Sequence, residues 1–387
     1  MVDKPATIAI IGPVVWGGVW GHGPELARYL GRANSVLYLN PVVPVGATAP
    51  SFHQSGAYPP AENVRVIQRR SGLRPGVLYG LAMEWRNFLA VLRSKPDYLV
   101  TYYPLGSLIA LLWCRIRRIR ALLVFADFPD ILGHRLARLV ARTIGLPLTV
   151  RLAGTGSVAT SYLLYEDLRK HTRRCVLIPN GVDLSRLQEK DENETTPPKK
   201  SETGTAFRVG FVGFFGEWVD LELILEAARL CPQTEFVLVG EGSGRAMLEK
   251  AAGTLNNVRL TGALPHDRVF AEIRRMDLGL VPFKVNRMTD RVSPVKLFEY
   301  WAMGRPVLAT GCRELRRVAE EAPRALRFFS DAGELAELIN QMAQDPGALE
   351  EAGRESLRAV KDYDWQVLGA RIESLLKGEN PVCQNRP

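Results

Sequence analysis

Short apolar segments alternate with helical patterns along the whole chain, and this alternation constrains the fold more than any other feature. In the first half, the apolar segments predicted to be strands are TIAIIG (7–12), VLYLN (36–40), YLVTYY (98–103), ALLVFADF (121–128), LPLTVRLA (146–153) and CVLIPNG (175–181). Amphipathic patterns such as LAMEWRNFLAVLRS lie between them. Unbroken apolar strands separated by helices are typical of a parallel sheet covered on both faces.

The same alternation restarts after the polar stretch EKDENETTPPKKSETGTA, which contains no large aliphatic side chain. The strands expected there are RVGFVG (208–213), EFVLVGEG (235–242), NVRLTG (257–262), DLGLVPF (277–283) and VLAT (307–310). The sequence therefore predicts an α/β protein with two Rossmann-like, doubly wound parallel-sheet domains and an interdomain cleft. We expect the domains at residues 1–188 and 207–362, a polar linker at 189–206, and a helix and tail at 363–387 that cross back to the N-terminal domain.

Length and composition agree with a soluble two-domain protein. A chain of 387 residues favours two domains. The five cysteines lie far apart without CxxC spacing, which argues against a zinc site or a disulfide framework and favours a reducing, cytoplasmic location. We interpret the apolar stretch TIAIIGPVVWGGVW as a strand and loop rather than a signal peptide. No apolar run reaches the roughly 18 residues that a membrane helix needs.

Positive charge is concentrated in the first half. Residues 1–189 hold 23 Lys/Arg and 11 Asp/Glu, a net charge of +12, whereas the remainder holds 27 and 30, a net charge of −3. The basic segments are WCRIRRIR, LGHRLARLVARTIG and RKHTRR. We favour an anionic membrane surface as their partner; solvated helix faces are the alternative, and no nucleic-acid-binding motif is present.

Ligands of open parallel sheets bind beyond the carboxyl ends of the strands, so the loops at those ends carry the candidate site. In the first half this loop is PVVWGGVWGHG (13–23), in which four of eleven residues are glycine. It contains Gly17, Gly18 and His22 and leads into a helix whose N-terminus would favour an anion. The alternative is a loop that needs glycine only for its geometry.

In the second half the segment RVSPVKLFEYWAMGRPVLAT (291–310) combines a helix start with charged side chains. We expect Ser293 to cap this helix and Pro294 to occupy its first turn. The free N–H groups of Val295, Lys296 and Leu297, together with the Lys296 ammonium, would then suit a diphosphate. Glu299, one turn later, could accept two sugar or ribose hydroxyls. A weak surface Lys–Glu pair is the alternative.

These residues also carry a resemblance. SPVKLFEYWAMGRPVLAT, IPNGVDLSRL (178–187) and VGEGSGR (239–245) resemble the GT-B glycosyltransferases, in particular the family-4-like glycosyl transferases group 1. The resemblance covers about residues 170–370 well and the N-terminal half in outline. It implies a nucleoside-diphosphate sugar bound by the C-terminal domain, with Glu299 at the ribose.

The full set of expected donor-binding residues draws on both domains. It comprises Gly17, Gly18, Gly213, Phe214, Gly240, Glu241, Gly242, Phe283, Arg291, Ser293, Val295, Lys296, Leu297 and Glu299.

The chain departs from the family pattern at two places. Arg291 stands where the family has the first carboxylate of its Glu-x7-Glu pattern, and GFFGEWVD (213–220) lacks the family's Arg/Lys pair. We hypothesise that Lys296, the helix N-terminus, and Arg287 or Arg291 supply the missing positive charge.

Candidate catalytic groups lie in the first half. Asp127 is the first choice, as a general base for the acceptor hydroxyl in an inverting enzyme or as a polar group at the anomeric face in a retaining one. Asp130 lies three residues further in the same loop, and His22 is the alternative. Either aspartate could instead cap the following helix. No metal motif such as HExxH appears, and no cofactor is expected.

The resemblance implies a metal-independent, retaining transfer from a UDP- or GDP-sugar to a hydroxyl of a lipid-linked saccharide. Such a reaction would serve envelope or exopolysaccharide synthesis at the inner face of the cell membrane. Two alternatives remain open: a nucleotide-sugar epimerase on the same fold, and a catalytically inactive sugar-nucleotide-binding scaffold.

Overall fold

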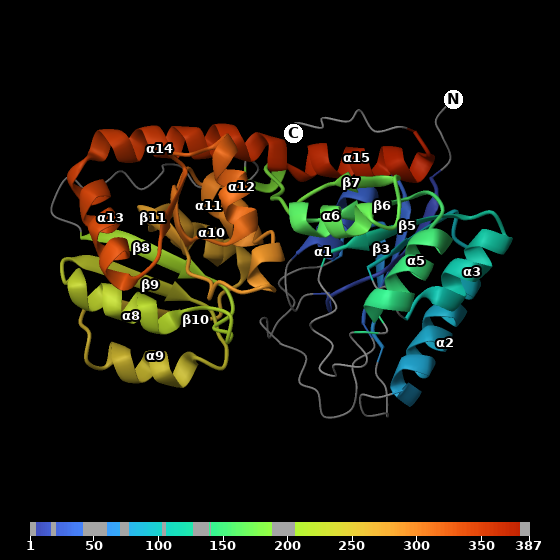
Figure 1. Cartoon of the computed structure of the whole chain (residues 1–387), viewed down its shortest axis with the longest axis horizontal. Coiled ribbons are helices and arrows are strands. Elements are labelled where there is room, and N and C mark those ends of the chain that lie inside the picture. Colours follow the sequence, from blue (N-terminus) through green and yellow to red (C-terminus); the bar gives the residue numbers. More distant parts are fainter. Residues whose placement is uncertain are drawn as a thin grey trace. The chain divides into compact units, whose positions relative to one another are not determined.

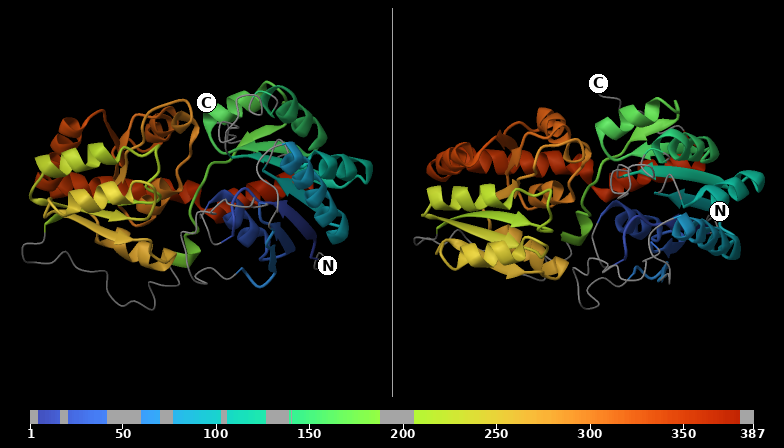
Figure 2. Two further views of the ribbon diagram at one scale, coloured as in Figure 1. Left: turned by 90° about the horizontal axis from the view of Figure 1, so that it is seen from below. Right: turned by 60° about the horizontal axis from the view of Figure 1, so that its bottom comes forward.

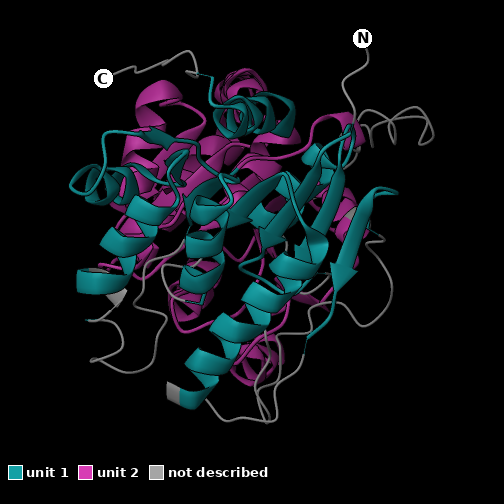
Figure 3. Cartoon of the chain, turned by 90° about the vertical axis from the view of Figure 1, so that its right-hand side faces the viewer, with its two compact units in different colours: residues 1–180, 365–387 teal, residues 181–364 magenta. Residues whose placement is uncertain are grey.

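A computed structural model describes residues 5–16, 21–41, 60–69, 77–102, 106–126, 139, 141–187 and 206–379. The chain divides into two compact units, residues 1–180 with 365–387 and residues 181–364, which Figure 3 colours separately. Residues 181–187, assigned from the sequence to the first domain, group with the second unit, where Val182 pairs with Asp364. The predicted linker lies almost entirely outside the described residues.

The first unit is built on a seven-stranded sheet of order β3-β2-β1-β4-β5-β6-β7 in which every pairing is parallel. Its strands are β1 (Thr7–Ile11), β2 (Ser35–Leu39), β3 (Val64–Ile67), β4 (Tyr98–Thr101), β5 (Arg120–Phe125), β6 (Gly156–Ala159) and β7 (Cys175–Leu177). Its helices are α1 (His22–Leu30), α2 (Val77–Ser94), α3 (Leu108–Ile116), the π-helix η2 (Ala141–Gly145), α5 (Leu146–Leu152), α6 (Tyr162–Arg169) and α15 (Trp365–Lys377).

Two separate cores cover the two faces of this sheet. On one face, α1 and α15 pack against residues such as Ile10 and Val124. On the other face, α2, α3, α5 and α6 pack against residues such as Ile11 and Phe125. Figures 1 and 2 show helices on both sides of the strands. The strands therefore bury both faces, which explains their unbroken apolar sequences.

The second unit has a six-stranded parallel sheet of order β10-β9-β8-β11-β12-β13. Its strands are β8 (Phe207–Val212), β9 (Thr234–Val239), β10 (Val258–Gly262), β11 (Leu278–Val281), β12 (Val307–Thr310) and β13 (Leu326–Phe329). Its helices are α8 (Leu221–Leu230), α9 (Arg245–Ala252), α10 (His266–Arg275), η3 (Thr289–Arg291), α11 (Val295–Ala302), α12 (Arg313–Glu321), α13 (Ala332–Gln344), α14 (Pro346–Ala359) and η4 (Val360–Tyr363). The predicted fold class, two doubly wound parallel sheets, is confirmed.

One predicted strand is wrong. LPLTVRLA (146–153) forms helix α5, with Pro147 in its first turn, and the strand follows at Gly156–Ala159. Leu146, Thr149 and Val150 are buried, which is the i, i+3, i+4 spacing of a helix. A short apolar run fits a strand and a buried helix equally well, and the proline favours the helix start. The edge strands β3 and β13 were not predicted from the sequence.

Within the described residues, no helix is both long and apolar enough to cross a membrane.

Candidate functional site

The strand order of each sheet reverses at one point, and this point locates the candidate site in each unit. In the second unit the reversal lies between β8 and β11. The loops after β8, β9 and β11 leave from the same edge of the parallel sheet, and α11 begins after the last of them. Ligands of doubly wound folds bind at this position.

Helix α11 begins one residue later than predicted. Pro294 is its N-cap, in an extended conformation, and no side chain caps the helix. The prediction that Ser293 caps the helix is therefore wrong; Ser293 is buried instead. The N–H of Leu297 donates to the carbonyl of Pro294 at 3.1 Å, so it is already used inside the first turn, contrary to the prediction. Proline at the N-cap has no backbone N–H to donate. The free N–H groups at the start of the helix are therefore those of Val295 and Lys296.

The Lys296 side chain folds back toward the end of β8. Its Nζ lies 4.0 Å from the centre of the Phe211 ring and 5.5 Å from that of Phe283. A Cβ on Gly213 would lie 2.8 Å from the same Nζ, so glycine leaves room for the ammonium. Burial among these groups lowers the Lys296 pKa to about 7, and the nearby Glu299 carboxylate opposes that shift only in part. Lys296 is thus poised to gain a proton when an anion binds beside it.

Glu299 is held by a residue that the sequence analysis missed. Its Oε1 lies 2.9 Å from Nε2 of His266, the first residue of α10, and both side chains are buried. The His266 ring also packs edge-on against Phe270 at 4.6 Å. Since 33 residues separate the partners, only the sheet topology brings α10 to α11; a histidine after Leu-Pro at a helix start was the available signal.

The glycines of the predicted donor loops allow two loops to pack closely. Gly213, Gly240 and Gly242 all have positive φ, at 134°, 147° and 153°. A Cβ on Gly240 would overlap the carbonyl oxygen of Gly213, and one on Gly242 would lie 2.7 Å from the backbone of Phe215. The close packing of the two loops therefore requires glycine at these positions whether or not a ligand binds.

The remaining predicted side chains of these loops lie at the same edge. Glu241 pairs with Arg245 of α9. Phe214 packs against the half-exposed Trp218 with ring centres 5.5 Å apart. Phe283 is buried, and its carbonyl accepts from the Thr310 hydroxyl at 2.6 Å. Glu241 thus has a partner on the helix that follows its loop, and Phe283 is part of the core behind Lys296.

Arg291 is the last residue of the 3₁₀ turn η3. Its Nη1 donates to the carbonyl of Arg287 at 2.9 Å, within the same turn. Asp290 beside it accepts from the backbone N–H of Arg313 at 3.0 Å, which ties the turn to α12. The proposed replacement of missing charge is therefore best supported for Lys296.

In the first unit His22 occupies the corresponding reversal point, between β1 and β4. Its Nδ1 lies 2.7 Å from the Tyr102 hydroxyl, and its ring packs edge-on against Trp365 at 4.9 Å. Burial lowers the His22 pKa to about 3, with only partial compensation from the backbone at Ile178. The imidazole is therefore neutral at neutral pH and suited to hydrogen bonding more than to proton uptake.

Several predicted residues lie outside the described parts of the chain. They are Gly17, Gly18, Asp127 and Asp130. The side chains of Arg135, Arg138 and Arg142 in the basic segment LGHRLARLVARTIG are also outside. In the other two basic segments, the exposed residues are Arg115, Arg117, Arg118, Arg120, Arg169, Lys170, His171, Arg173 and Arg174. Among the described residues, no group of His, Cys, Asp or Glu could hold a metal ion.

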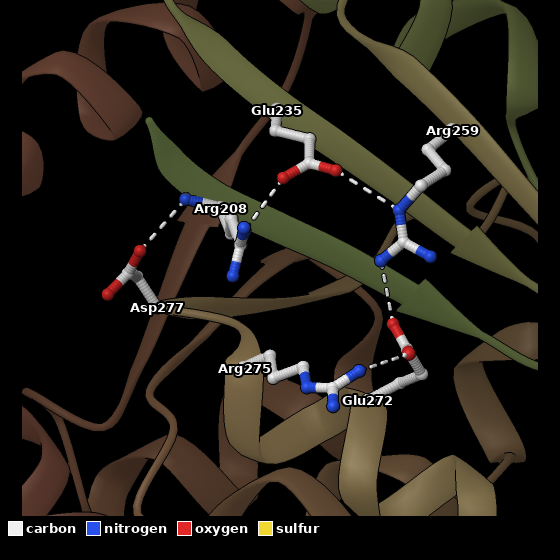
Figure 4. Close-up of polar contacts among 6 residues, drawn as sticks. All are labelled: Arg208, Glu235, Arg259, Glu272, Arg275 and Asp277. Carbon is white, nitrogen blue, oxygen red and sulfur yellow. Dashed lines mark hydrogen bonds and ion pairs between the residues drawn. The ribbon is translucent and has the colours of Figure 1, made fainter. Parts of the chain in front are cut away.

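The opposite edge of the second sheet carries a chain of ion pairs (Figure 4). Glu235 of β9 accepts from Arg208 Nε at 2.7 Å and from Arg259 Nε at 3.1 Å. Arg259 continues to Glu272 of α10 at 2.7 Å. These side chains lie at the amino ends of their strands, away from the carboxyl-end loops, and join α10 to the sheet.

Comparisons with known proteins match this architecture. The family model of glycosyl transferases group 1 matches residues 206–345, which lie in the second unit. TuaH of Bacillus subtilis strain 168, named as a candidate teichuronic acid biosynthesis glycosyltransferase, is 33% identical over 167 residues. That alignment covers 42% of this chain and 41% of TuaH, so the match spans about two fifths of this relative's length.

Two solved structures resemble nearly the whole chain. Sucrose-phosphate synthase from Thermosynechococcus elongatus superposes with a TM-score of 0.71 at 16% identity, covering 96% of this chain and 98% of that one. Anabaena HepE, in complex with UDP and glucose, superposes with a TM-score of 0.64 at 16% identity, covering 97% and 100%. Likeness at this identity establishes the fold and leaves the activity to be argued from the site.

Residues 206–345 thus match the glycosyl transferases group 1 model, and the two parallel-sheet units have the GT-B fold.

Proposed function

We propose that the protein is a glycosyltransferase that uses a nucleoside-diphosphate sugar, either a UDP- or a GDP-sugar. One observation carries the proposal: Lys296 and Glu299 stand on the first turns of one helix, at the reversal point of the second sheet. The Lys296 ammonium beside Gly213 suits the diphosphate, and the Glu299 carboxylate suits the ribose hydroxyls.

Different groups of this site would bind the diphosphate and orient the ribose. The amide edge of α11 and Lys296 would neutralise the diphosphate, whose negative charge grows as the sugar leaves. His266 would fix the carboxylate of Glu299, since a buried carboxylate with one oxygen already bonded presents the other in a defined direction. The first unit would bind the acceptor, with Asp127 as the polar group at the reacting carbon, and Asp130 and the neutral His22 as the other candidates.

The acceptor that we propose is a hydroxyl of a lipid-linked saccharide in cell-envelope or exopolysaccharide synthesis. TuaH is named for teichuronic acid biosynthesis, and this relationship supports the acceptor class. We further propose transfer with retention and without a metal, as the family resemblance implies. Nuclear magnetic resonance of the product's anomeric proton tests retention, and activity in excess EDTA tests the metal requirement.

A thermal-shift series tests the donor site directly. UDP, GDP, ADP and their sugars are added to the full chain, because a ligand of the folded state raises its apparent stability. We expect one base to raise Tm, and Lys296→Ala to weaken that nucleotide's binding by about 100-fold through loss of a charged contact to phosphate. Lys284→Ala, an exposed lysine of the same segment, is the matched control. Absence of any shift with all three nucleotides would refute the donor site.

Turnover then distinguishes the proposal from its two alternatives. A transferase slowly releases the nucleoside diphosphate from the donor without acceptor. A nucleotide-sugar epimerase interconverts the sugars without release, and an inactive scaffold binds the donor without turnover. Either of the last two results would overturn the transferase assignment while leaving the donor site intact.

The role of His266 as a positioning residue is tested by two substitutions. His266→Ala should raise the donor KM about 10-fold with a smaller change in kcat, since one hydrogen bond to a charged group is lost. His266→Gln can still donate to Glu299 and should recover most of this loss. Equal defects in both variants would contradict a positioning role.

A further inference from the structure

Helix α2 of the first unit has the reverse of the usual polarity. Leu78, Leu81, Trp85 and Leu92 follow one another at helical spacing along one stripe, and all four are exposed to solvent. Leu78 is 71% exposed and Trp85 is 55% exposed. Phe88 extends the stripe, with its ring 5.4 Å from that of Trp85. An apolar stripe of this length normally packs on the sheet, but here it faces outward.

The inward side of α2 combines the buried Val91 with polar side chains. Asn87 is buried; it accepts from the Arg69 guanidinium and donates to the carbonyl of Gly106. Glu84 accepts from the backbone N–H of Gly106 and, at 3.3 Å, from that of Ile109. Burial raises the Glu84 pKa, although these backbone donors oppose the shift. The orientation of α2 is therefore fixed by specific hydrogen bonds, and the outward apolar stripe is a consequence of the fold.

Neighbouring helices continue the apolar surface. Helix α3 packs against both α2 and α5, and Figure 1 shows the three together on one side of the first unit. We use the term apolar face for the nine exposed side chains of this region: Leu78, Leu81, Trp85, Leu92, Leu112, Ile116, Leu139, Ile144 and Leu148. Ile116 is 71% exposed. Large exposed apolar side chains on neighbouring helices are typical of an interaction surface.

On α2, α3 and α5, and in the residues just after α3, the exposed charged side chains that the structure describes are arginines. Exposed arginines of α2, α3 and α5 and of the residues that follow α3 are Arg86, Arg93, Arg115, Arg117, Arg118 and Arg151. The helices α2, α3, η2 and α5 contain a single carboxylate, Glu84, and it faces inward. Helices that join large apolar side chains to arginines, with no exposed carboxylate among their described residues, are complementary to anionic lipid headgroups above an acyl layer.

We propose that the apolar face docks on an anionic lipid bilayer, with Leu78, Leu81 and Trp85 of α2 inserted into the headgroup region and the arginines at the phosphate level. The arginine stems can lie along the apolar region while their guanidinium groups stay at the phosphates. This inference deepens the proposed function, because it names the surface that would bring the acceptor-binding unit to a lipid-linked acceptor. The basic segments alone were expected to contact the membrane; the proposed membrane contact is instead the apolar face together with the arginines around it.

Vesicle co-sedimentation of the full chain, without any sugar nucleotide, tests the docking. Two kinds of vesicle serve as probes. One is pure phosphatidylcholine, and the other contains about 30% phosphatidylglycerol as the anionic lipid. The double substitution Leu81→Ser/Trp85→Ser should weaken partitioning onto both kinds of vesicle by at least about 10-fold, since two inserted apolar side chains are lost. The control is Leu230→Ser/Val285→Ser, which removes two exposed apolar side chains of the second unit.

A second pair of substitutions tests the charge. Arg93→Gln/Arg117→Gln should weaken binding to the anionic vesicles by about 5-fold for each charge removed and leave phosphatidylcholine binding unchanged. The salt dependence of binding should fall in parallel. Trp85 fluorescence, measured as the difference from Trp85→Phe, should shift to shorter wavelength only with vesicles.

Three results would overturn the docking. They are failure of the wild-type chain to bind anionic vesicles, equal binding by the Leu81→Ser/Trp85→Ser variant, and a dimer in vesicle-free solution that this variant disperses. The last result would assign the apolar face to a second copy of the chain. The nucleotide-induced rise in Tm is measured on the same variants, so a failure of docking with donor binding retained refutes the lipid surface alone.

Discussion

The two units share an architecture but present different surfaces. Among the described residues, the exposed large apolar side chains of the second unit are Trp218, Leu230, Val285 and Leu357, from two loops and two helices. Those of the first unit include nine on α2, α3, η2 and α5 and at position 139. The described ion pairs of the second unit include Arg208–Glu235, Arg259–Glu272 and Arg324–Glu351. In a parallel sheet with helices on both faces, the outer helix surfaces are not needed for the core and can differ. They carry ion pairs in the second unit and apolar side chains with arginines in the first.

The two units also differ in the side chains at the reversal points of their sheets. Both sheets offer a reversal point, but the second unit places an ionisable lysine and a carboxylate there, Lys296 and Glu299, while the first places the neutral pair His22 and Tyr102. Burial raises the Tyr102 pKa well above its usual value, so this pair stays uncharged. A diphosphate needs positive charge, and a sugar acceptor needs neutral hydrogen-bonding partners, which agrees with the proposed assignment of donor and acceptor.

The largest expected effect comes from the loop packing of the second unit. Gly240→Ala should destabilise this unit by about 3 kcal/mol or more and remove the nucleotide-induced rise in Tm, because the new Cβ overlaps the backbone of Gly213 at a positive φ. Circular dichroism during heating measures the effect. Gly253→Ala is the control, since its φ is −68° and its nearest neighbours are 3.5 Å away. Equal Tm values for the two variants would show that the loops relax freely.

The reversed polarity of α2 should also appear in stability. Asn87→Leu should cost about 2 kcal/mol, because it removes one acceptor of the Arg69 guanidinium and the side-chain donor to the Gly106 carbonyl. Trp85→Ser should change the free energy of unfolding by less than about 0.5 kcal/mol, because Trp85 is largely exposed. Urea unfolding followed by far-ultraviolet circular dichroism measures both. A larger loss for Trp85→Ser than for Asn87→Leu would contradict the exposed stripe.

The depressed Lys296 pKa predicts how donor affinity depends on pH. Below about pH 7 the free protein already carries the proton that the diphosphate requires, so Kd should be constant. Above about pH 7 binding must take up a proton, and Kd should rise by about 10-fold per pH unit until the pKa of the complex is reached. Isothermal titration calorimetry with the preferred nucleotide, in buffers of different ionisation enthalpy, measures Kd and proton uptake.

Lys296→Arg provides the control for that titration, because a guanidinium stays protonated throughout the range. The Kd of this variant for the nucleotide should be independent of pH between about 6 and about 9. The same slope in the variant and in the wild type would assign the titration to another group.

The smallest expected effect lies in the ion-pair chain at the amino edge of the second sheet. Glu235→Gln should cost no more than about 1 kcal/mol, because these side chains are partly exposed. Burial works against ionisation, but hydrogen bonds from Arg208 and Arg259 outweigh it and lower the Glu235 pKa. The difference between wild type and variant should therefore be present at neutral pH and vanish as pH falls below about 4. Nucleotide binding should not change, and a change would link the two edges of the sheet.

Much of the site could be predicted from the sequence because its parts are local. The strand ends, the glycine loops and the start of α11 are consecutive patterns, so Lys296, Glu299 and Gly213 were placed at one sheet edge. The capping residue was displaced by one position, since a serine followed by proline fits both N-cap and preceding loop. His266 could not be predicted, because its contact with Glu299 depends on the side-by-side placement of α10 and α11.

The sequence by itself determined that this protein has two parallel-sheet units, since runs of apolar residues too short to span a membrane and interrupted by helices can be buried only in this way. It also determined which loops meet at the carboxyl ends of the strands. Only the tertiary structure decided that α5 is a helix and that the apolar stripe of α2 faces outward. Periodicity shows that a helix has two faces; which face is covered depends on the partners that the fold brings to it, here Arg69 and the Gly106 backbone on the polar side.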